Sequence, residues 1–332
     1  MSAPSEASLL SRRDVLAMTA AAFTARGRFG GLRPASQPTT AVSFAVPRGA
    51  CDCHTHVFGD PRRFPFVPGR TYTPESASVA EMRALHRALH TTRVVVVQPS
   101  VYGTDNRCTL DAIHQLGAAA RGVAVIDDGT SDAALDEMNE RGMRGIRINL
   151  ATAGQTDPEV GRRRFDAAVA RLGRRPWHIQ MYTQLPMIVA LHKELSSSPV
   201  PIVFDHFGGA RADGGTTQAG FDVLLDLVRS GRAYVKVSAP YRGSTKEPDF
   251  DDMGPLARAL IGANVQRVLW GTDWPHPDTS QGNGRKPTDI SPLRQIDDGR
   301  VFNQLAVWAP TAGERRTILV DNPRALYGFD GG

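Results

Sequence analysis

The sequence predicts a single-domain (β/α)8 barrel of the TIM type. Short runs rich in β-branched residues alternate with segments of helical periodicity, which is typical of a parallel sheet covered by helices. The apolar runs are 51–56, 93–98, 122–127, 145–150, 178–182, 201–206, 234–238 and 267–273, and the helical segments are 78–90, 106–120, 132–141, 158–172, 185–195, 220–229 and 254–261. Eight runs favour a closed barrel over a doubly wound open sheet, and no G-x-G-x-x-G motif follows the first run.

The composition indicates an ordinary globular chain and excludes several protein classes. The 332 residues are 41% hydrophobic, yet no run reaches the roughly 18–20 apolar residues of a membrane span. The net charge is +5, but the arginines are scattered, so we expect no nucleic-acid partner; some of them could bind an anionic substrate. The chain has three cysteines, Cys51, Cys53 and Cys108, and this small, odd number argues against a disulfide framework.

The first forty residues are predicted to lie outside the barrel. Ser11-Arg12-Arg13 precedes the alanine-rich run 17–23, a pattern that resembles a twin-arginine export signal. Residues 27–40 are rich in Gly, Pro, Ser and Arg, as in a linker. We therefore assign 1–40 to leader and linker and 41–332 to the barrel. A periplasmic location is expected, with a cytoplasmic protein carrying a disordered tail as the alternative.

Polar side chains stand at the predicted strand ends, where barrel enzymes place their active sites. They are His54, His56, Gln98, Ser100, Asp127, Arg147, Asn149, Tyr182, Asp205, His206, Lys236, Ser238 and Asp273. Because isolated polar groups in a core cost stability, such a ring is better explained as the lining of a pocket. In 51–56, strand alternation predicts Asp52, His54 and His56 on one face and Cys51, Cys53 and Thr55 on the other.

Two of these residues are candidates for proton transfer and electrostatic catalysis. Asp273 ends an apolar strand and precedes Trp-Pro, so its carboxylate could take a proton from water at the barrel mouth; its alternative role is to cap the following loop. His206 precedes Phe-Gly-Gly, and the glycines would let a substrate approach closely; its alternative is a histidine satisfied at a turn. His178 lies two pleats below Tyr182 and is predicted to be structural.

Together, these motifs resemble the amidohydrolase superfamily. They are His54-x-His56 on the first strand, Asp205-His206-Phe207-Gly208 on the sixth, and 271–277, Gly-Thr-Asp-Trp-Pro-His-Pro, on the eighth. Within the superfamily the chain, from about Gly49 to Phe329, is similar to the hydrolases of 2-pyrone-4,6-dicarboxylate and 4-sulfomuconolactone. The resemblance implies hydrolysis of a lactone of a small polyanionic acid from aromatic-compound degradation. A metal-dependent decarboxylase of the superfamily and a non-enzymatic barrel that binds an acidic ligand are the alternatives.

The resemblance also implies roles for individual residues. Asp273 would be the general base, with His54, His56 and His206 polarising the lactone carbonyl. The positions that would contact the substrate are Tyr72, Ser100, Arg147, Tyr182 and Arg242. Fixed donors are what a developing oxyanion requires, and arginine forks suit the acidic substituents.

Two departures from the family pattern bear on cofactor and substrate. The fifth strand ends in Tyr182, where zinc-binding relatives supply a histidine; if Zn2+ is present, His54, His56, His206 and Asp273 would hold it. The pyrone-dicarboxylate enzyme has a second arginine soon after the one matched by Arg147, whereas 149–155 contain no basic residue here. This favours a substrate with different anionic groups. The sequence leaves the metal and the oligomeric state open.

Overall fold

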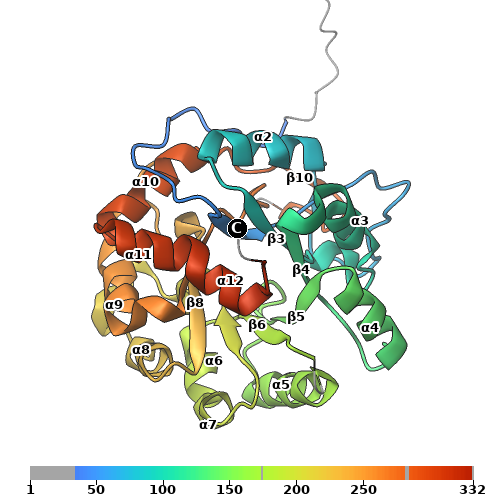
Figure 1. Ribbon diagram of the computed structural model, residues 1–332. Helices are drawn as coiled ribbons and strands as arrows, with labels where there is room; N and C mark the ends of the chain where they lie inside the picture. The colour runs from blue at the N-terminus through green and yellow to red at the C-terminus, as the bar shows by residue number, and fades with distance from the viewer. Residues whose placement is uncertain (1–33, 173–174, 281–283, 331–332) are drawn as a thin grey trace, which may run out of the picture. The chain divides into compact units, whose positions relative to one another are not determined.

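Eight parallel strands form a nearly closed barrel in this protein (Figure 1). The computed structural model describes residues 34–172, 175–280 and 284–330. In order around the sheet, the strands are β1 (Cys51–Thr55), β3 (Arg93–Val97), β4 (Ala120–Ala124), β5 (Met143–Asn149), β6 (His178–Tyr182), β7 (Ile202–Phe204), β8 (Ala233–Ser238) and β9 (Val268–Gly271). The predicted (β/α)8 barrel is confirmed, and each predicted apolar run overlaps one of these strands.

Helices surround the strands, and most lie where the periodicity predicts them (Figure 1). They are α2 (Val79–Leu89), α3 (Arg107–Leu116), α4 (Asp132–Glu140), α5 (Pro158–Leu172), α6 (Leu185–Ala190), α7 (His192–Ser196), α8 (Phe221–Arg229), α9 (Gly254–Asn264), α10 (Asp298–Trp308), α11 (Ala312–Arg316) and α12 (Asn322–Tyr327). The single helix predicted over 185–195 is two short helices, α6 and α7. A capping box between Ser78 and Glu81 fixes the start of α2.

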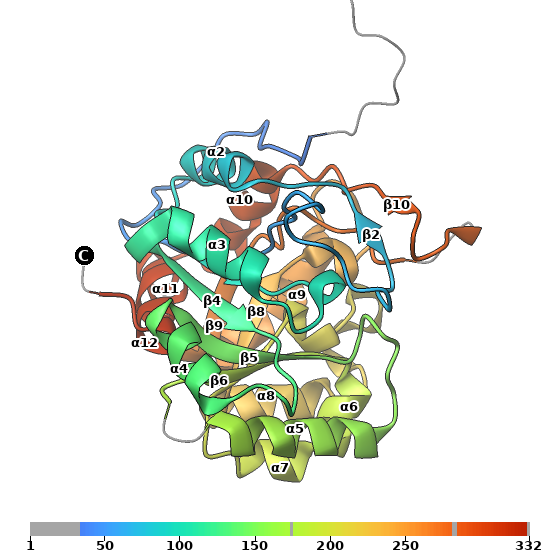
Figure 2. The same cartoon turned by 90° about the vertical axis from the view of Figure 1, so that its right-hand side faces the viewer.

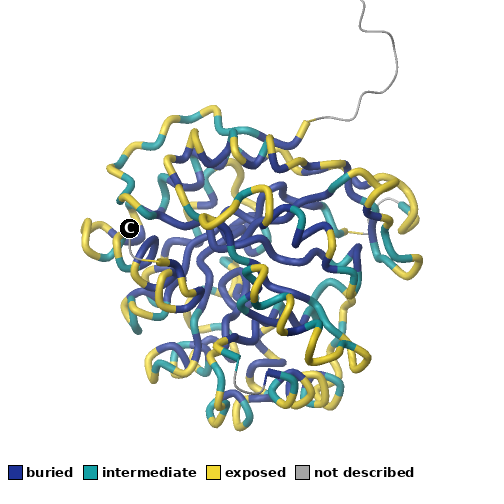
Figure 3. Tube along the Cα trace, turned by 45° about the vertical axis from the view of Figure 1, so that its right-hand side comes forward, coloured by how far each residue is buried: buried dark blue, intermediate teal, exposed yellow. Residues whose placement is uncertain are grey.

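The two ends of the barrel differ in what covers them. In β3, Val94 and Val96 pack in the outer core with the helices, whereas Val95 and Val97 join an inner apolar cluster that includes Tyr327. Figure 3 shows these strands as the buried centre, with exposed positions on the surrounding helices. Figure 2 shows α12 at one end and the small sheet of β2 (Thr73–Pro74) and β10 (Ile290–Ser291) at the other. Because the inner apolar cluster fills the α12 end, the polar strand ends can open only at the other one.

The alternation predicted for β1 holds from His54 onward but is wrong for Asp52 and Cys53. The register between β1 and β3 shifts between Asp52 and Thr55, which marks a bulge. Asp52 therefore points outward, where its Oδ2 lies 3.3 Å from Nε2 of His86 in α2. Cys53 belongs to the inner cluster, and the next residue, His54, also faces the barrel interior. The irregularity thus turns two consecutive side chains to the same side.

Asp52 closes the seam between the first and last strands. Its Oδ1 accepts hydrogen bonds from the backbone N–H groups of His54 (3.2 Å) and Thr272 (3.0 Å). Its Oδ2 accepts a third from the hydroxyl of Thr272 at 2.7 Å. One backbone bond, from the N–H of Asp273 to the carbonyl of His54 at 2.8 Å, continues the seam to the barrel mouth. The buried carboxylate of Asp52 therefore supplies hydrogen bonds that hold the first and last strands together.

We expect Asp52→Asn to lower the free energy of unfolding by about 1.5–3 kcal/mol, because one amide oxygen replaces two charged acceptors. Urea denaturation measures the change, with Asp60→Asn, at an exposed position, as the control. Equal stability of the two variants would contradict this role.

Residues 36–40, which the sequence assigns to the linker, contact the barrel. The carbonyl of Ser36 accepts a bond from the indole N–H of Trp274 at 3.0 Å, and the hydroxyls of Thr39 and Thr40 each donate to Asp297 at 2.6 Å. Residues 1–33 lie outside the described residues, so the boundary between leader, linker and barrel stays a prediction. The arginine pair of the proposed export signal lies outside the described residues, so export stays a prediction. None of the described helices is long and apolar enough to cross a membrane.

Candidate active site

The carboxylate of Asp273 lies among the three histidines that the sequence singled out. Its Oδ1 is 3.5 Å from Nε2 of His54, 3.3 Å from Nε2 of His56 and 3.7 Å from Nε2 of His206. All four side chains are buried. The structure thus brings together the four predicted catalytic residues, which come from β1 and from the loops that follow β1, β7 and β9.

The other carboxylate oxygen of Asp273 is held by two residues that follow β8. Oδ2 accepts a hydrogen bond from the hydroxyl of Tyr241 at 2.6 Å and another from Nε of Arg242 at 2.8 Å. Burial alone would raise the pKa of Asp273, but the charge of Arg242 and the nearby imidazoles outweigh it and hold the pKa well below its usual value. The acid is therefore ionised at neutral pH and can accept a proton.

Sequence analysis missed Tyr241 and predicted only a substrate contact for Arg242. The backbone of Ala239 is left-handed, with φ of 49°, and a 3-10 turn over Pro240–Arg242 follows it. This turn brings two consecutive side chains to one acceptor, which strand alternation cannot anticipate. The one feature of the sequence that could have indicated this turn is Pro240, because a proline ring restricts the backbone next to Tyr241.

Two functional side chains sit on strained backbone. His206 has φ of 49° and Asp273 has φ of 65°, in a region that non-glycine residues avoid at a cost of about 1–3 kcal/mol. Both residues lie just beyond the strands that carry them, β7 and β9. The left-handed turns aim these side chains across the barrel mouth rather than along the strands.

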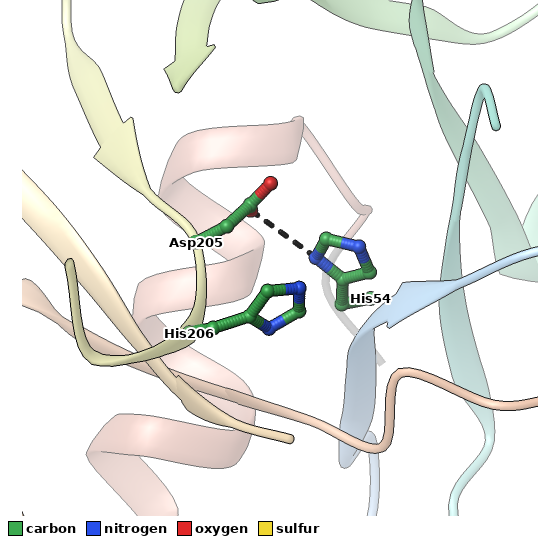
Figure 4. A group of neighbouring side chains, drawn as sticks. All are labelled: His54, Asp205 and His206. Carbon is green, nitrogen blue, oxygen red and sulfur yellow. Dashed lines mark ion pairs between the residues drawn. The ribbon is translucent and has the colours of Figure 1, made fainter. Parts of the chain in front are cut away.

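A buried network of charges lies next to the imidazole of His54. Nδ1 of His54 is 3.1 Å from Oδ1 of Asp205, the contact drawn in Figure 4, and the same oxygen is 3.3 Å from Nζ of Lys236. Oδ2 of Asp205 is 3.3 Å from Nη2 of Arg147 and accepts a bond from Nε2 of Gln180 at 3.1 Å. Two cations thus share one carboxylate, which orients His54 with its Nε2 toward Asp273.

Hydrogen bonds at Nδ1 also fix the orientation of the other two imidazoles, those of His56 and His206. Nδ1 of His56 lies 2.8 Å from the carbonyl of Val97, which can only accept, so this nitrogen carries the proton. Nδ1 of His206 lies 2.9 Å from the hydroxyl of Ser238. Burial lowers the pKa of His206 to about 3 and that of His54 well below its usual value. The imidazoles of His54 and His206 are therefore neutral at pH 7, and all three histidines face Asp273 with their Nε2 atoms.

These donors fit a divalent cation. His54 Nε2 and Asp273 Oδ1 are buried and have no hydrogen-bond partner among the described residues, and His56 Nε2 lies beside them. Two imidazoles and a carboxylate are a ligand set that Zn2+ takes, whereas His206, predicted as a further ligand, lies outside this close cluster. A second cluster, His54 with Asp205 and His206, fits less well because Lys236 already contacts Asp205.

The predicted substrate-binding residues surround the space in front of Asp273. Tyr72, Ser100, Arg147, Tyr182 and Arg242 all border a gap of about 10 Å3. A space of this size, about 10–15 Å3, holds one water molecule, so no ring enters this gap until a bordering side chain moves. Burial raises the pKa of Tyr72 to about 12, so its phenol stays a donor.

Two other strand-end residues have different positions. Asp127 is exposed and does not border this gap. His178 is fully buried at the start of β6 beside the ring of Tyr327, and burial lowers its pKa to about 3, in agreement with the predicted structural role.

Comparisons with known proteins place the chain in a family. Residues 51–329 match the amidohydrolase family model. The chain is 36% identical over 294 residues to the 2-pyrone-4,6-dicarboxylate hydrolase of Comamonas testosteroni (86% of this chain, 92% of the relative) and 34% identical over 290 residues to the 4-sulfomuconolactone hydrolase of Hydrogenophaga intermedia (86% and 91%). A solved structure from Pseudomonas putida, named as a candidate 2-pyrone-4,6-dicarboxylic acid hydrolase, is 31% identical with a TM-score of 0.71 and covers 87% of this chain and 100% of its own. This chain therefore belongs to the amidohydrolase family.

Proposed function

We propose that the protein is a lactonase that hydrolyses the cyclic ester of a small polyanionic acid from aromatic-compound degradation. The observation that carries the proposal is the ionised carboxylate of Asp273 among three buried imidazoles, with Arg147 and Arg242 at the edge of the same gap. The named activities of the two curated relatives, both lactone hydrolases, support the same reaction class.

In the proposed reaction, Asp273 takes a proton from a water molecule. The water oxygen forms a bond to the lactone carbonyl carbon, and the carbonyl oxygen becomes an oxyanion. Collapse of this intermediate breaks the ring C–O bond, and the leaving alkoxide takes up the proton. The product is the open hydroxy acid. When Nδ1 of His206 accepts the hydroxyl proton of Ser238, its Nε2–H can donate a hydrogen bond to the oxyanion, with His54 and His56 beside the reacting group.

Acidic groups of the substrate would be held by arginine. Arg242 now pairs with Oδ2 of Asp273, and its pKa is well above the usual value because that carboxylate outweighs the effect of burial. A substrate carboxylate or sulfonate offers the same guanidinium an alternative partner. Its arrival would draw Arg242 from Asp273, widen the gap and free Oδ2 of the base.

Zn2+ at His54, His56 and Asp273 would polarise the carbonyl and lower the pKa of a bound water. In that case Asp205 and Lys236 would hold the ligand His54 in place through its other nitrogen.

The substrate is more consistent with 4-sulfomuconolactone than with 2-pyrone-4,6-dicarboxylate. In the loop after β5, Asn149 and Thr152 bond to each other, with the Asn149 amide donating to the Thr152 hydroxyl at 2.9 Å. Both border the gap, and the segment 149–155 has no cation. A second carboxylate on that side would have only neutral partners.

A panel of lactones, assayed with and without a chelator and followed by metal analysis of the protein, tests the proposal. Ring opening of acidic lactones is the expected result, and loss of activity on chelation would identify a metal enzyme. Release of carbon dioxide from acids of the panel, with no lactone opened, would instead favour the metal-dependent decarboxylase.

We expect Arg242→Gln to raise KM for acidic lactones about 10- to 100-fold, the equivalent of one or two charged hydrogen bonds. For lactones whose acid groups are methyl esters, KM should change little in Arg242→Gln, because these lactones cannot form the ion pair. Arg294→Gln, at a half-exposed arginine beside Tyr241, is the matched control. An equal loss for acidic and esterified lactones would argue against the proposed contact.

A further inference from the structure

A cavity of about 520 Å3 lies beside the gap in front of Asp273. We name it the α5 cavity, because Arg164, Ala167, Ala168 and Arg171 of α5 form one wall. The ends of β4 and β5 form the opposite side. Its volume is within the range of small-molecule sites, roughly 300–1,000 Å3, whereas the gap at Asp273 holds no ring. The room for the larger part of a substrate therefore lies in the α5 cavity.

The α5 cavity and the gap share three residues: Ser100, Arg147 and Asn149. Arg147 is buried between them, and its guanidinium is tied to the barrel through the carbonyl of Gln98 at 3.3 Å and through Asp205. Its Nε is buried and has no hydrogen-bond partner among the described residues. Arg147 therefore places a positive charge where the two spaces meet, to which an acid group on the substrate would be attracted.

Beyond Arg147 the walls are mostly apolar. Val125, Ile126, Ile146 and Ile148 line the cavity together with the two alanines of α5. These groups can bury an uncharged arm but offer it no hydrogen bond.

The charges at the outer rim balance one another. The rim carries two exposed carboxylates, Asp127 and Asp128, and two arginines, Arg164 and Arg171. Arg171 already lies 3.7 Å from the carboxylate of Asp132. An anionic arm that reached the rim would meet carboxylates as well as arginines. The cavity therefore does not select for a second acid group.

We propose that the α5 cavity is a substrate subsite for an uncharged apolar arm, the size of a phenyl ring or a short alkyl chain. The arm would be carried by a lactone whose acid group binds Arg147. The inference rests on the proposed lactone hydrolysis and narrows its substrate class to acidic lactones that carry an apolar substituent in addition to the acid groups bound by Arg147 and Arg242. A cavity of about 150 Å3 already accommodates a benzene ring, so the volume suffices.

Filling the cavity tests the proposal. Ala167 and Ala170 both lie on α5 and are both exposed, but only Ala167 lines the cavity. Ala167→Phe should narrow the cavity, and Ala170→Phe is its matched control. The substrates are a γ-butyrolactone carboxylate and its phenyl-substituted analogue. In the wild type and in Ala170→Phe, we expect the phenyl group to raise kcat/KM about 10- to 100-fold, the gain for burying one ring. In Ala167→Phe this gain should disappear, while kcat/KM for the compact lactone stays unchanged.

Binding of unreactive analogues separates this inference from the proposed reaction. The corresponding lactam carboxylates, with and without the phenyl group, can be titrated calorimetrically whether or not the protein opens lactones. A phenyl-dependent gain in affinity that Ala167→Phe removes and Ala170→Phe keeps would support the subsite even if no lactone is hydrolysed. The proposal is overturned if the phenyl group gives the wild type no gain, or if both variants keep the gain equally.

Discussion

Asp273→Asn should lower kcat by about 10²- to 10⁴-fold, the usual contribution of a positioned general base. The amide keeps the size of the side chain but cannot take a proton from water. Binding of acidic lactones should be retained, because Arg242 loses the carboxylate that competes for it. Steady-state kinetics with acidic lactones, together with calorimetric titration of the lactam carboxylates, separate the two effects.

The control for this change is Asp278→Asn, a carboxylate that pairs with Arg285 and Arg294 outside the gap. It should change kcat by less than about two- to threefold, as expected for a residue with no part in proton transfer. Near-normal turnover of Asp273→Asn would remove the basis of the proposed mechanism.

Asp205→Asn should lower the free energy of unfolding by about 3–5 kcal/mol, because it leaves two buried cations without their shared anion. Lys236 is fully buried and Arg147 nearly so, and both contact this carboxylate. Urea denaturation at neutral pH measures the loss. Asp213→Asn, at an exposed carboxylate paired with Arg211, should change stability by less than about 1 kcal/mol.

The stabilisation by Asp205 should depend on pH. Burial would raise the pKa of Asp205, but His54 and Lys236 outweigh it, so the pKa in the folded state is well below the usual value. The carboxylate therefore contributes fully above about pH 4, the pKa range of an unfolded aspartate, and its contribution falls as the pH drops toward the folded-state pKa. The difference in stability between the wild type and Asp205→Asn should narrow on acidification below about pH 4. A difference that is constant with pH would contradict the assigned charge.

The barrel and the group of catalytic candidates could be predicted because they depend on repeated local patterns. The helix α5 spans the predicted residues 158–172, since periodicity over many residues averages out local exceptions. His54, His206 and Asp273 meet because parallel strands of a closed barrel present their carboxyl ends at one face.

The rest of the site depends on single backbone irregularities and on long-range contacts. The bulge in β1 reverses the predicted faces of Asp52 and Cys53, and the left-handed turn at Ala239 brings Tyr241 to Asp273. No local pattern marks the bulge, and only Pro240 points to the turn. Lys236 was expected at the rim, but its ammonium donates to Gln180 at 2.7 Å inside the barrel, because β6 and β8 lie on either side of the short β7.

The bulge in β1 sets a minimum unit for protein engineering. A designer who transplanted only His54 and His56 onto a regular strand of another barrel would leave out the offset that separates Asp52 from the histidines. On such a strand the acid would point inward with them, and the neighbouring strand would lose the acceptor that now fastens it at Thr272. The portable unit is therefore the whole irregular stretch from Asp52 to His56 together with Thr272.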